Sequence, residues 1–286
     1  MNATFYSNRL KSDALGYSAP PTPPSDPVLA GDPDAHRWLR LQDIIEHAKR
    51  GHFDGIQEVL DLYKSAETAV LQFVASRILG DVAPDECFES LMVELEQESM
   101  VDNPSRIVDY VNALVTWGSL RVVPVLLDVY SRLRRSGRKS TIPIHLSYML
   151  EPDWGQISRD PSPSQLADYS NLVLSTYRET RGRWNTDDIY IFNGSQWSVI
   201  SLARLIVTHA HDRAYDHIAK YEFRWRFEAS TGIDCSPFYE DGRFQPLSAA
   251  SIAEEFLESD AATNYEEGVR YFFGHRIPRT LHAPNS

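Results

Sequence analysis

Hydrophobic and polar positions recur with a helical period along residues 37–140, and the pattern repeats as helical hairpins. Residues 75–95 and 113–133 share one template: an Ala, an apolar residue and a Gly four and five positions later, then apolar residues eight and eleven positions beyond the Gly. A helix that ends at Gly and leads into a second amphipathic helix is one unit of a helical solenoid. Residues 38–63 fit the same template around Gly51. The pattern predicts an all-α fold built as a HEAT-like helical hairpin solenoid.

The repeat becomes less regular toward the C-terminus. The marker glycines Gly51, Gly80 and Gly118 are 29 and 38 residues apart, whereas the HEAT and armadillo class repeats about every 40–47 residues. After residue 140 the helical period persists without the template, so we expect a less regular helical C-terminal half. Helices are predicted over 144–152, 165–180, 195–211, 213–230 and 248–259, with a short extended piece over 187–192.

Three regions follow from these patterns. Residues 1–36 lack periodicity, and Ser18–Pro27 contains five prolines, which fix φ and remove donors. We therefore expect a disordered, Pro-rich N-terminal tail over 1–36. HEAT-like repeats should occupy 37–140, and the helical C-terminal half, 141–286, should pack on the same body.

Composition and charge narrow the classes of function. The 286-residue chain has a formal net charge of −12, which disfavours direct binding to nucleic acid or to an anionic membrane. Neither a secretory leader nor a long apolar segment occurs, so we expect a cytoplasmic protein. Two cysteines are too few for a multi-cysteine zinc site. No GxSxG, GxGxxG or GxxxxGK[ST] motif is present, so the sequence predicts no enzyme, no catalytic or metal-ligating residues and no cofactor.

Acidic residues are unevenly distributed, and they supply the candidate partner-binding residues. Between Arg77 and Arg106 there are eight acids and no Lys or Arg, and the last predicted helix adds further glutamates. Such a surface would steer a basic partner, although exposed charge is also ordinary on a solvated helix. The candidate contacts are Asp85, Glu86, Glu89, Glu94, Glu96, Glu254, Glu255 and Glu258.

One cluster offers an alternative chemistry. His209, His211, Asp212, Asp216 and His217 lie within nine residues, and a metal-dependent hydrolase could use such groups if other helices supplied further ligands. The competing interpretation is a polar helix end with exposed histidines. A second open question is the aromatic run Tyr271–Phe273, which could cap the last repeat or anchor a partner.

Several segments resemble a bacterial immunity-protein family of the polymorphic toxin systems, the immunity protein 47-like family. The resemblance is carried by IIEHAKRGHFDGIQEVLDLY, RILGDVAPDE, IPIHLSYMLEP, FEASTGIDCSPFY, FQPLSAASIAEEFLES and YEEGVRYFFGHRIP, which together span about residues 38–278. It implies a protein that neutralises a cognate toxin by stoichiometric binding, and the acidic surface favours a basic toxin. A cytoplasmic helical-repeat scaffold or adaptor is the alternative, and a hydrolase using His209, His211 and Asp212 is the second alternative.

Overall fold

The computed structural model describes residue 17 and residues 33–97, 103–152, 156–212, 217–240 and 243–279. Within these residues the fold is predominantly helical, with eleven α-helices covering 65% and a few short strands. The prediction of an all-α protein is therefore confirmed. Most of the predicted Pro-rich tail lies outside the described residues, and the first described helix begins at Ala35.

Contacts divide the chain into two compact units. Unit 1 combines Met1–Pro84 with Ser198–Ser286, and unit 2 is the continuous stretch Asp85–Trp197. The boundary expected near residue 140 falls inside unit 2, between its third and fourth helices. Sequence periodicity did not indicate that unit 1 is discontinuous, because its two halves meet only through tertiary contacts.

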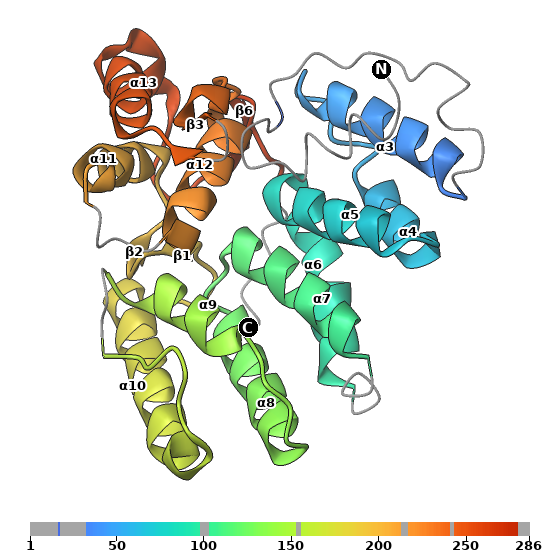
Figure 1. The fold of residues 1–286 in the computed structure, drawn as a ribbon, viewed down its shortest axis with the longest axis vertical. Coiled ribbons are helices and arrows are strands. Elements are labelled where there is room, and N and C mark those ends of the chain that lie inside the picture. Colours follow the sequence, from blue (N-terminus) through green and yellow to red (C-terminus); the bar gives the residue numbers. More distant parts are fainter. Residues whose placement is uncertain are drawn as a thin grey trace. The chain divides into compact units, whose positions relative to one another are not determined.

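The first half of unit 1 is a helical hairpin followed by a third helix: α3 (Ala35–Ala48), α4 (Gln57–Ser65) and α5 (Ala69–Val82) (Figure 1). The buried Asp34 carboxylate joins the starts of α3 and α5, because it accepts bonds from the Thr68 hydroxyl at 2.6 Å and from the amides of Glu67 and Thr68. Burial alone would raise the pKa of Asp34, but these hydrogen bonds outweigh it and hold the pKa below its usual value.

The end of α5 differs from the sequence prediction. Gly80 was expected to stop the helix, but α5 continues to Val82 and Pro84 follows. The reason is a cap from far along the chain: the buried Arg270 guanidinium donates to the carbonyl oxygens of Gly80 at 2.6 Å and Ala83 at 2.8 Å. These bonds satisfy carbonyl groups that a helix end would otherwise leave without a donor.

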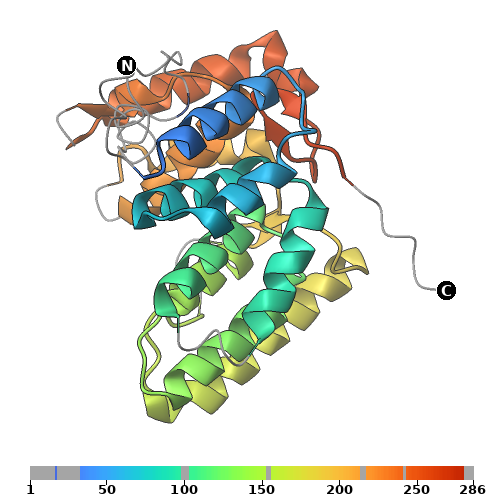
Figure 2. The same cartoon turned by 90° about the vertical axis from the view of Figure 1, so that its right-hand side faces the viewer.

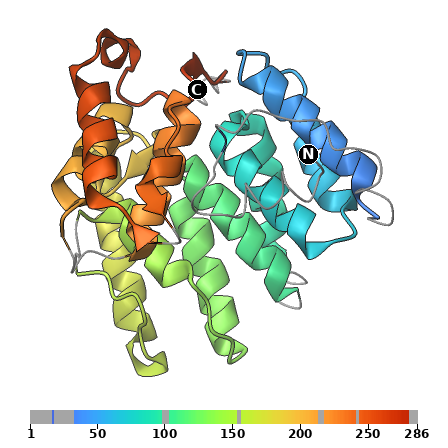
Figure 3. The ribbon, with the colours of Figure 1, turned by 45° about the horizontal axis from the view of Figure 1, so that its top comes forward.

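The second half of unit 1 contains α11 (Val199–His209), α12 (His217–Thr231) and α13 (Pro246–Glu258). Helix α11 packs against both α12 and α13, and α12 also packs on α5 (Figure 3). Short 3-10 turns are η3 (Ser236–Phe238) and η4 (Asp260–Asn264). The three helices predicted for this region are confirmed, with ends that differ by a few residues.

Unit 2 contains the other five helices of the described chain: α6 (Asp85–Glu96), α7 (Pro104–Trp117), α8 (Val122–Arg135), α9 (Ile142–Leu150) and α10 (Leu166–Trp184), with the 3-10 turn η2 (Pro163–Gln165) before α10. Gly118 ends α7 with φ +78°, as its template position predicted. Helix α8 packs against α7 and α9, and α10 runs beside α8 (Figure 2).

Three short antiparallel hairpins interrupt the helices. They are β1 (Ile191–Phe192) with β2 (Ser195–Gln196), β3 (Tyr239–Glu240) with β4 (Arg243–Phe244), and β5 (Tyr271–Phe272) with β6 (His275–Arg276). The first belongs to unit 2 and the others to unit 1.

Two of these hairpin turns cap helices. The β1–β2 turn, Asn193–Gly194, and the β5–β6 turn, Phe273–Gly274, have positive φ at both positions, the pattern of a type I′ turn. The turn amides of Asn193 and Gly194 donate to the last carbonyls of α9, and those of Phe273 and Gly274 donate to carbonyls at the end of α12. The hairpins thus supply helix C-caps that the sequence pattern did not reveal.

Candidate partner-binding surface

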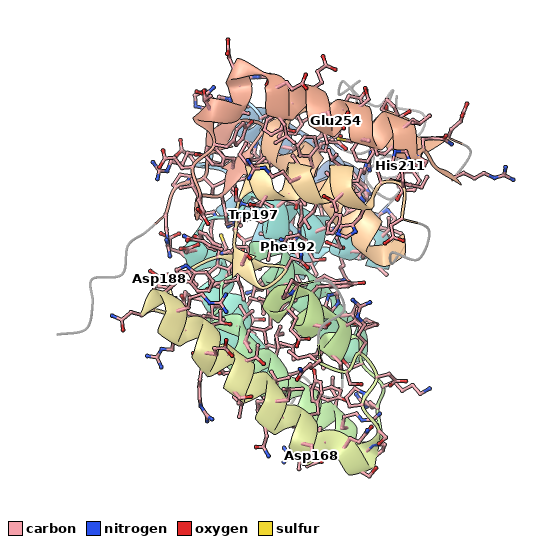
Figure 4. All side chains as sticks on the ribbon, turned by 90° about the vertical axis from the view of Figure 1, so that its left-hand side faces the viewer. Asp168, Asp188, Phe192, Trp197, His211 and Glu254 are labelled. Atoms are coloured by element: carbon pink, nitrogen blue, oxygen red, sulfur yellow. The ribbon has the colours of Figure 1, made fainter. Side chains whose placement is uncertain are left out.

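The outer face of α13 presents a row of carboxylates. Ala249, Ala250, Ala253 and Phe256 are buried. The small alanines allow α13 to approach α11 closely. Helical spacing places the exposed residues on the other side, and these are Leu247, Ser251, Glu254, Glu255 and Glu258. Figure 4 locates Glu254 on this helix.

The charge of α13 is unbalanced along its axis. The helix contains no Lys, Arg or His, and its three glutamates fall within its last five residues. The C-terminal end of a helix carries a partial negative charge, so carboxylates there oppose the helix dipole. At the other end, Leu247 leaves 76% of its surface exposed. Neither feature stabilises the isolated helix, which is why this face is the stronger candidate for contact with a partner.

The acidic residues of α6 are placed differently. Asp85 is not on an exposed surface: it is buried, and its Oδ1 accepts bonds from Trp117 Nε1 at 2.8 Å and from the Tyr190 hydroxyl at 2.6 Å. Trp117 also stacks on Phe88, with ring centroids 4.6 Å apart. Asp85 is therefore an internal hydrogen-bond acceptor in unit 2, and its prediction as a partner-binding residue is wrong.

Two further α6 glutamates are paired within the unit. Arg121 donates to both oxygens of Glu89, at 2.6 and 3.1 Å. Glu94 accepts from the Tyr110 hydroxyl at 2.6 Å and lies 3.4 Å from Arg106. Burial and the nearby Glu94 carboxylate raise the pKa of Tyr110. Both glutamates are half-buried, so their charges are partly neutralised by partners on the same unit.

Glu86 and Glu96 are the exposed acids among the α6 candidates. Glu86 lies in the first turn, where a carboxylate interacts favourably with the helix dipole, so its position has a structural explanation. The candidates thus divide between two units: α6 belongs to unit 2 and α13 to unit 1.

The described members of the His209 cluster, His209, His211 and Asp212, lie at the end of α11 and just beyond it. His209 is half-buried at the end of α11 and lines a small pocket with aromatic side chains, whereas His211 and Asp212 are exposed beyond the helix (Figure 4). Asp216 and the side chain of His217 lie outside the described part of the structure. Within the described part of the chain, no group of three or more His, Cys, Asp or Glu residues is arranged to hold a metal ion.

Sequence reasoning missed a buried polar cluster in unit 1. Asp81 was counted with the exposed acids, but it is 8% exposed and accepts a 2.6 Å bond from the Tyr17 hydroxyl. Burial raises the pKa of Asp81 to about 6, although Arg77 and Tyr17 act in the opposite direction. The available signal was its neighbours in the chain, Leu79 and Val82, which place Asp81 on an apolar stretch.

Comparisons with protein-family models, curated proteins and solved structures found no match for this chain. Among the helices that the structure describes, none combines the length and apolar character needed to cross a bilayer. The functional interpretation therefore rests on the residues of this chain and their geometry.

Proposed function

We propose that this protein is an immunity protein that binds a cognate, basic toxin stoichiometrically through the outer face of α13. The observation that carries the proposal is the position of Glu254, Glu255 and Glu258, which are exposed at the negative end of a helix without any basic residue. Carboxylates at this end of a helix interact unfavourably with its dipole, and a basic partner would offset that cost.

Complementary charge also suits the task. Opposite potentials accelerate encounter and suppress binding to wrong partners, which an inhibitor of a toxic protein requires. The exposed Leu247 on the same face would add apolar contact beside the charged area. The toxin as partner comes from the sequence resemblance of six segments to the immunity protein 47-like family, whereas the charge of α13 by itself indicates only a basic partner.

We infer a HEAT-like hairpin arrangement for helices α3–α5 of unit 1 and for helices α6–α8 of unit 2. Support comes from helices adjacent in sequence that pack on one another, α3 with α4 and α4 with α5 in unit 1, and α6 with α7 and α7 with α8 in unit 2. In repeat proteins such pairs stack to give extended binding surfaces.

The test is a binding and growth assay with a candidate toxin, defined as a protein that is encoded beside this chain and kills cells when it is expressed alone. Co-expression of the intact chain should restore growth, and the purified pair should form a one-to-one complex. The variant E254Q/E255Q/E258Q should bind about 10-fold more weakly, because three rim ion pairs contribute about 0.5 kcal/mol each. Its affinity should also depend less on salt.

Matched variants assign the effect to a surface. D168N/E179Q removes exposed charge from α10, and E86Q/E96Q removes it from α6. Weakening by the α13 variant alone supports the proposed face, whereas weakening by E86Q/E96Q alone moves the site to α6. Failure of the intact chain to bind or protect would reject the immunity function, and binding to a non-toxic partner would favour a scaffold.

A further inference from the structure

Tyr17 is anchored in the interior of unit 1, far in sequence from the residues that surround it. Its side chain is 1% exposed, and its hydroxyl donates to Asp81 Oδ2 at 2.6 Å. Its carbonyl oxygen accepts a 2.8 Å bond from Lys49 Nζ, which follows α3. Both the side chain and the main chain of Tyr17 are therefore held by specific polar contacts.

Aromatic side chains complete the enclosure. The Tyr17 ring meets Trp225, Phe272 and Phe273 edge-on, with centroids 5.6, 5.4 and 6.3 Å away. Edge-to-face pairs at these distances are attractive beyond the area they bury. We call the set Lys49, Asp81, Trp225, Phe272 and Phe273 the Tyr17 socket; it combines α5, α12, the β5–β6 hairpin and the residue after α3.

The socket discriminates by chemistry as well as by shape. Asp81 is flanked by Arg77 on its own helix and by Glu222 and Arg226 on α12. A phenol hydroxyl reaches the carboxylate, whereas a phenylalanine ring would fill the same space and donate nothing. Sites built to hydrogen-bond a hydroxyl reject the analogue that lacks it, because a buried acceptor is then left without that donor.

The floor of the socket is also held in an unusual conformation. Phe273 has φ +50°, a region that bulky side chains rarely adopt. Its ring packs so closely on Gly232 that a Cβ there would lie 2.7 Å from the ring, and Lys49 Nζ lies 5.0 Å from the ring centroid. Strained residues of this kind are concentrated at ligand clamps and switch regions.

We propose that the Tyr17 socket is a recognition site for a tyrosine-bearing peptide segment, occupied in cis by the chain's own N-terminal segment as a displaceable tethered ligand. Fifteen residues, five of them proline, separate Tyr17 from Pro33 in the sequence, which is enough chain for Tyr17 to leave the socket and return without any change at Pro33. Tyr17 can therefore be treated as a ligand that is covalently joined to its own binding site. This inference concerns a site distinct from α13 and does not depend on the toxin.

The experiment uses the full chain with Tyr17→Ala and a labelled synthetic peptide, SDALGYSAPPT, that matches residues 12–22. Fluorescence anisotropy should show saturable binding to the variant and at least about 10-fold weaker binding to the natural chain, whose socket is occupied. A peptide with Phe in place of Tyr should bind about 10-fold more weakly than the tyrosine peptide. A folded Tyr17→Ala chain that binds neither peptide would overturn the proposal.

A second variant covers the case in which Tyr17→Ala does not fold. A protease recognition sequence inserted between Ser25 and Asp26 keeps Tyr17 in the chain until cleavage. After cleavage, the N-terminal piece should stay associated on gel filtration and exchange with the labelled tyrosine peptide, but not with the phenylalanine peptide. Release of the piece without uptake of peptide, or equal exchange of both peptides, would reject a tyrosine-recognising socket.

Discussion

Three of the buried aspartates in the described part of the chain, Asp34, Asp81 and Asp85, accept hydrogen bonds from residues that are distant in the sequence. An unpaired buried carboxylate is costly, so each of these acids constrains the elements that donate to it. Asp34 links α3 to α5, Asp81 holds Tyr17, and Asp85 joins α6 to α7 and to Tyr190. At the scale of single residues, some of the acidic side chains are therefore buried structural groups that a partner cannot contact.

Asp85→Ala should destabilise unit 2 strongly. It removes the acceptor of both Trp117 Nε1 and the Tyr190 hydroxyl, and leaving buried donors unsatisfied costs about 1–3 kcal/mol each. We expect a loss of roughly 2–5 kcal/mol in urea denaturation. Glu86→Ala, the neighbouring exposed position, should change stability by less than about 1 kcal/mol. Equal losses for the two variants would contradict the internal role of Asp85.

The pKa of Asp81 predicts the sign of a pH effect. Its pKa in the folded chain is about 6, above the ordinary value of 3.8, so between these values the folded state holds a proton that the unfolded state releases. Protonated Asp81 therefore stabilises the fold below about pH 4, and this contribution disappears as the pH rises through about 6.

The matched variant Asp81→Asn removes this titration. The stability of the natural chain minus that of Asp81→Asn should fall by up to roughly 3 kcal/mol between pH 4 and pH 6.5, then remain level. Urea denaturation across pH 4–8 measures the difference. Parallel curves for the two proteins over that range would show that Asp81 titrates normally.

At the scale of elements, the sequence revealed helices well and their ends less well. Apolar periodicity predicted α10, α11 and α13, and the Gly118 marker predicted the end of α7 correctly. Gly80 misled because the cap of α5 is Arg270, 190 residues away from it in the chain. Local pattern contains no information about such a donor.

The hairpins show a missed local signal. Asn193–Gly194 lies between short apolar runs, which is a strong sequence signature of a two-residue hairpin turn, yet only an extended piece was expected there. For the β5–β6 hairpin, Phe273 gave no such signal, because an aromatic residue at positive φ is uncommon. Tertiary support from Gly232 and the α12 carbonyls explains that turn.

The candidate surface was predictable where exposure follows helical spacing, and not where burial decides. Glu254, Glu255 and Glu258 were chosen as the acids of the last predicted helix, and all three are exposed on α13. Helical spacing could not separate Asp85 from Glu86, because the difference depends on Trp117 and Tyr190, which no local rule places near α6.

A pair of glycines tests how tightly α7 joins the β1 strand. Gly118 and Gly137 both follow a helix in the left-handed region, with φ +78° and +75°. A Cβ on Gly137 meets nothing within 4 Å, whereas one on Gly118 lies 3.1 Å from the Ile191 carbonyl oxygen. Gly137→Ala should cost about 1–2 kcal/mol through backbone conformation alone. Gly118→Ala should lower the stability measured by thermal unfolding by more than Gly137→Ala does. Equal losses for the two variants would show that β1 shifts to make room for the added Cβ.

At the scale of the whole molecule, the two units differ in how the chain builds them. Unit 2 is a single continuous stretch, while α5 of unit 1 depends on α12 and the β5–β6 hairpin from the other end of the chain. Contacts of such long sequence separation form slowly, because loop-closure entropy must be paid before they stabilise anything.

This difference predicts which piece folds alone. A fragment of residues 85–197 should show helical circular dichroism and cooperative thermal unfolding, since the Phe88–Trp117 stack and the Asp85 hydrogen bonds lie within it. A fragment of residues 33–84 should unfold without cooperativity, because the partners of α5 are missing. Cooperative unfolding of the second fragment, or none in the first, would contradict the division.

The Arg270 cap on α5 has a consequence for synthesis on the ribosome. Arg270 follows Gly80 by 190 residues, so at about 5–20 residues per second the carbonyls at the end of α5 wait roughly 10–40 s for their donor. Unit 2 is fully translated within that interval. Unit 2 could therefore fold during translation, while the α3–α5 segment would still lack its C-terminal partners. Chaperones would have access to α3–α5 before Arg270 is synthesised.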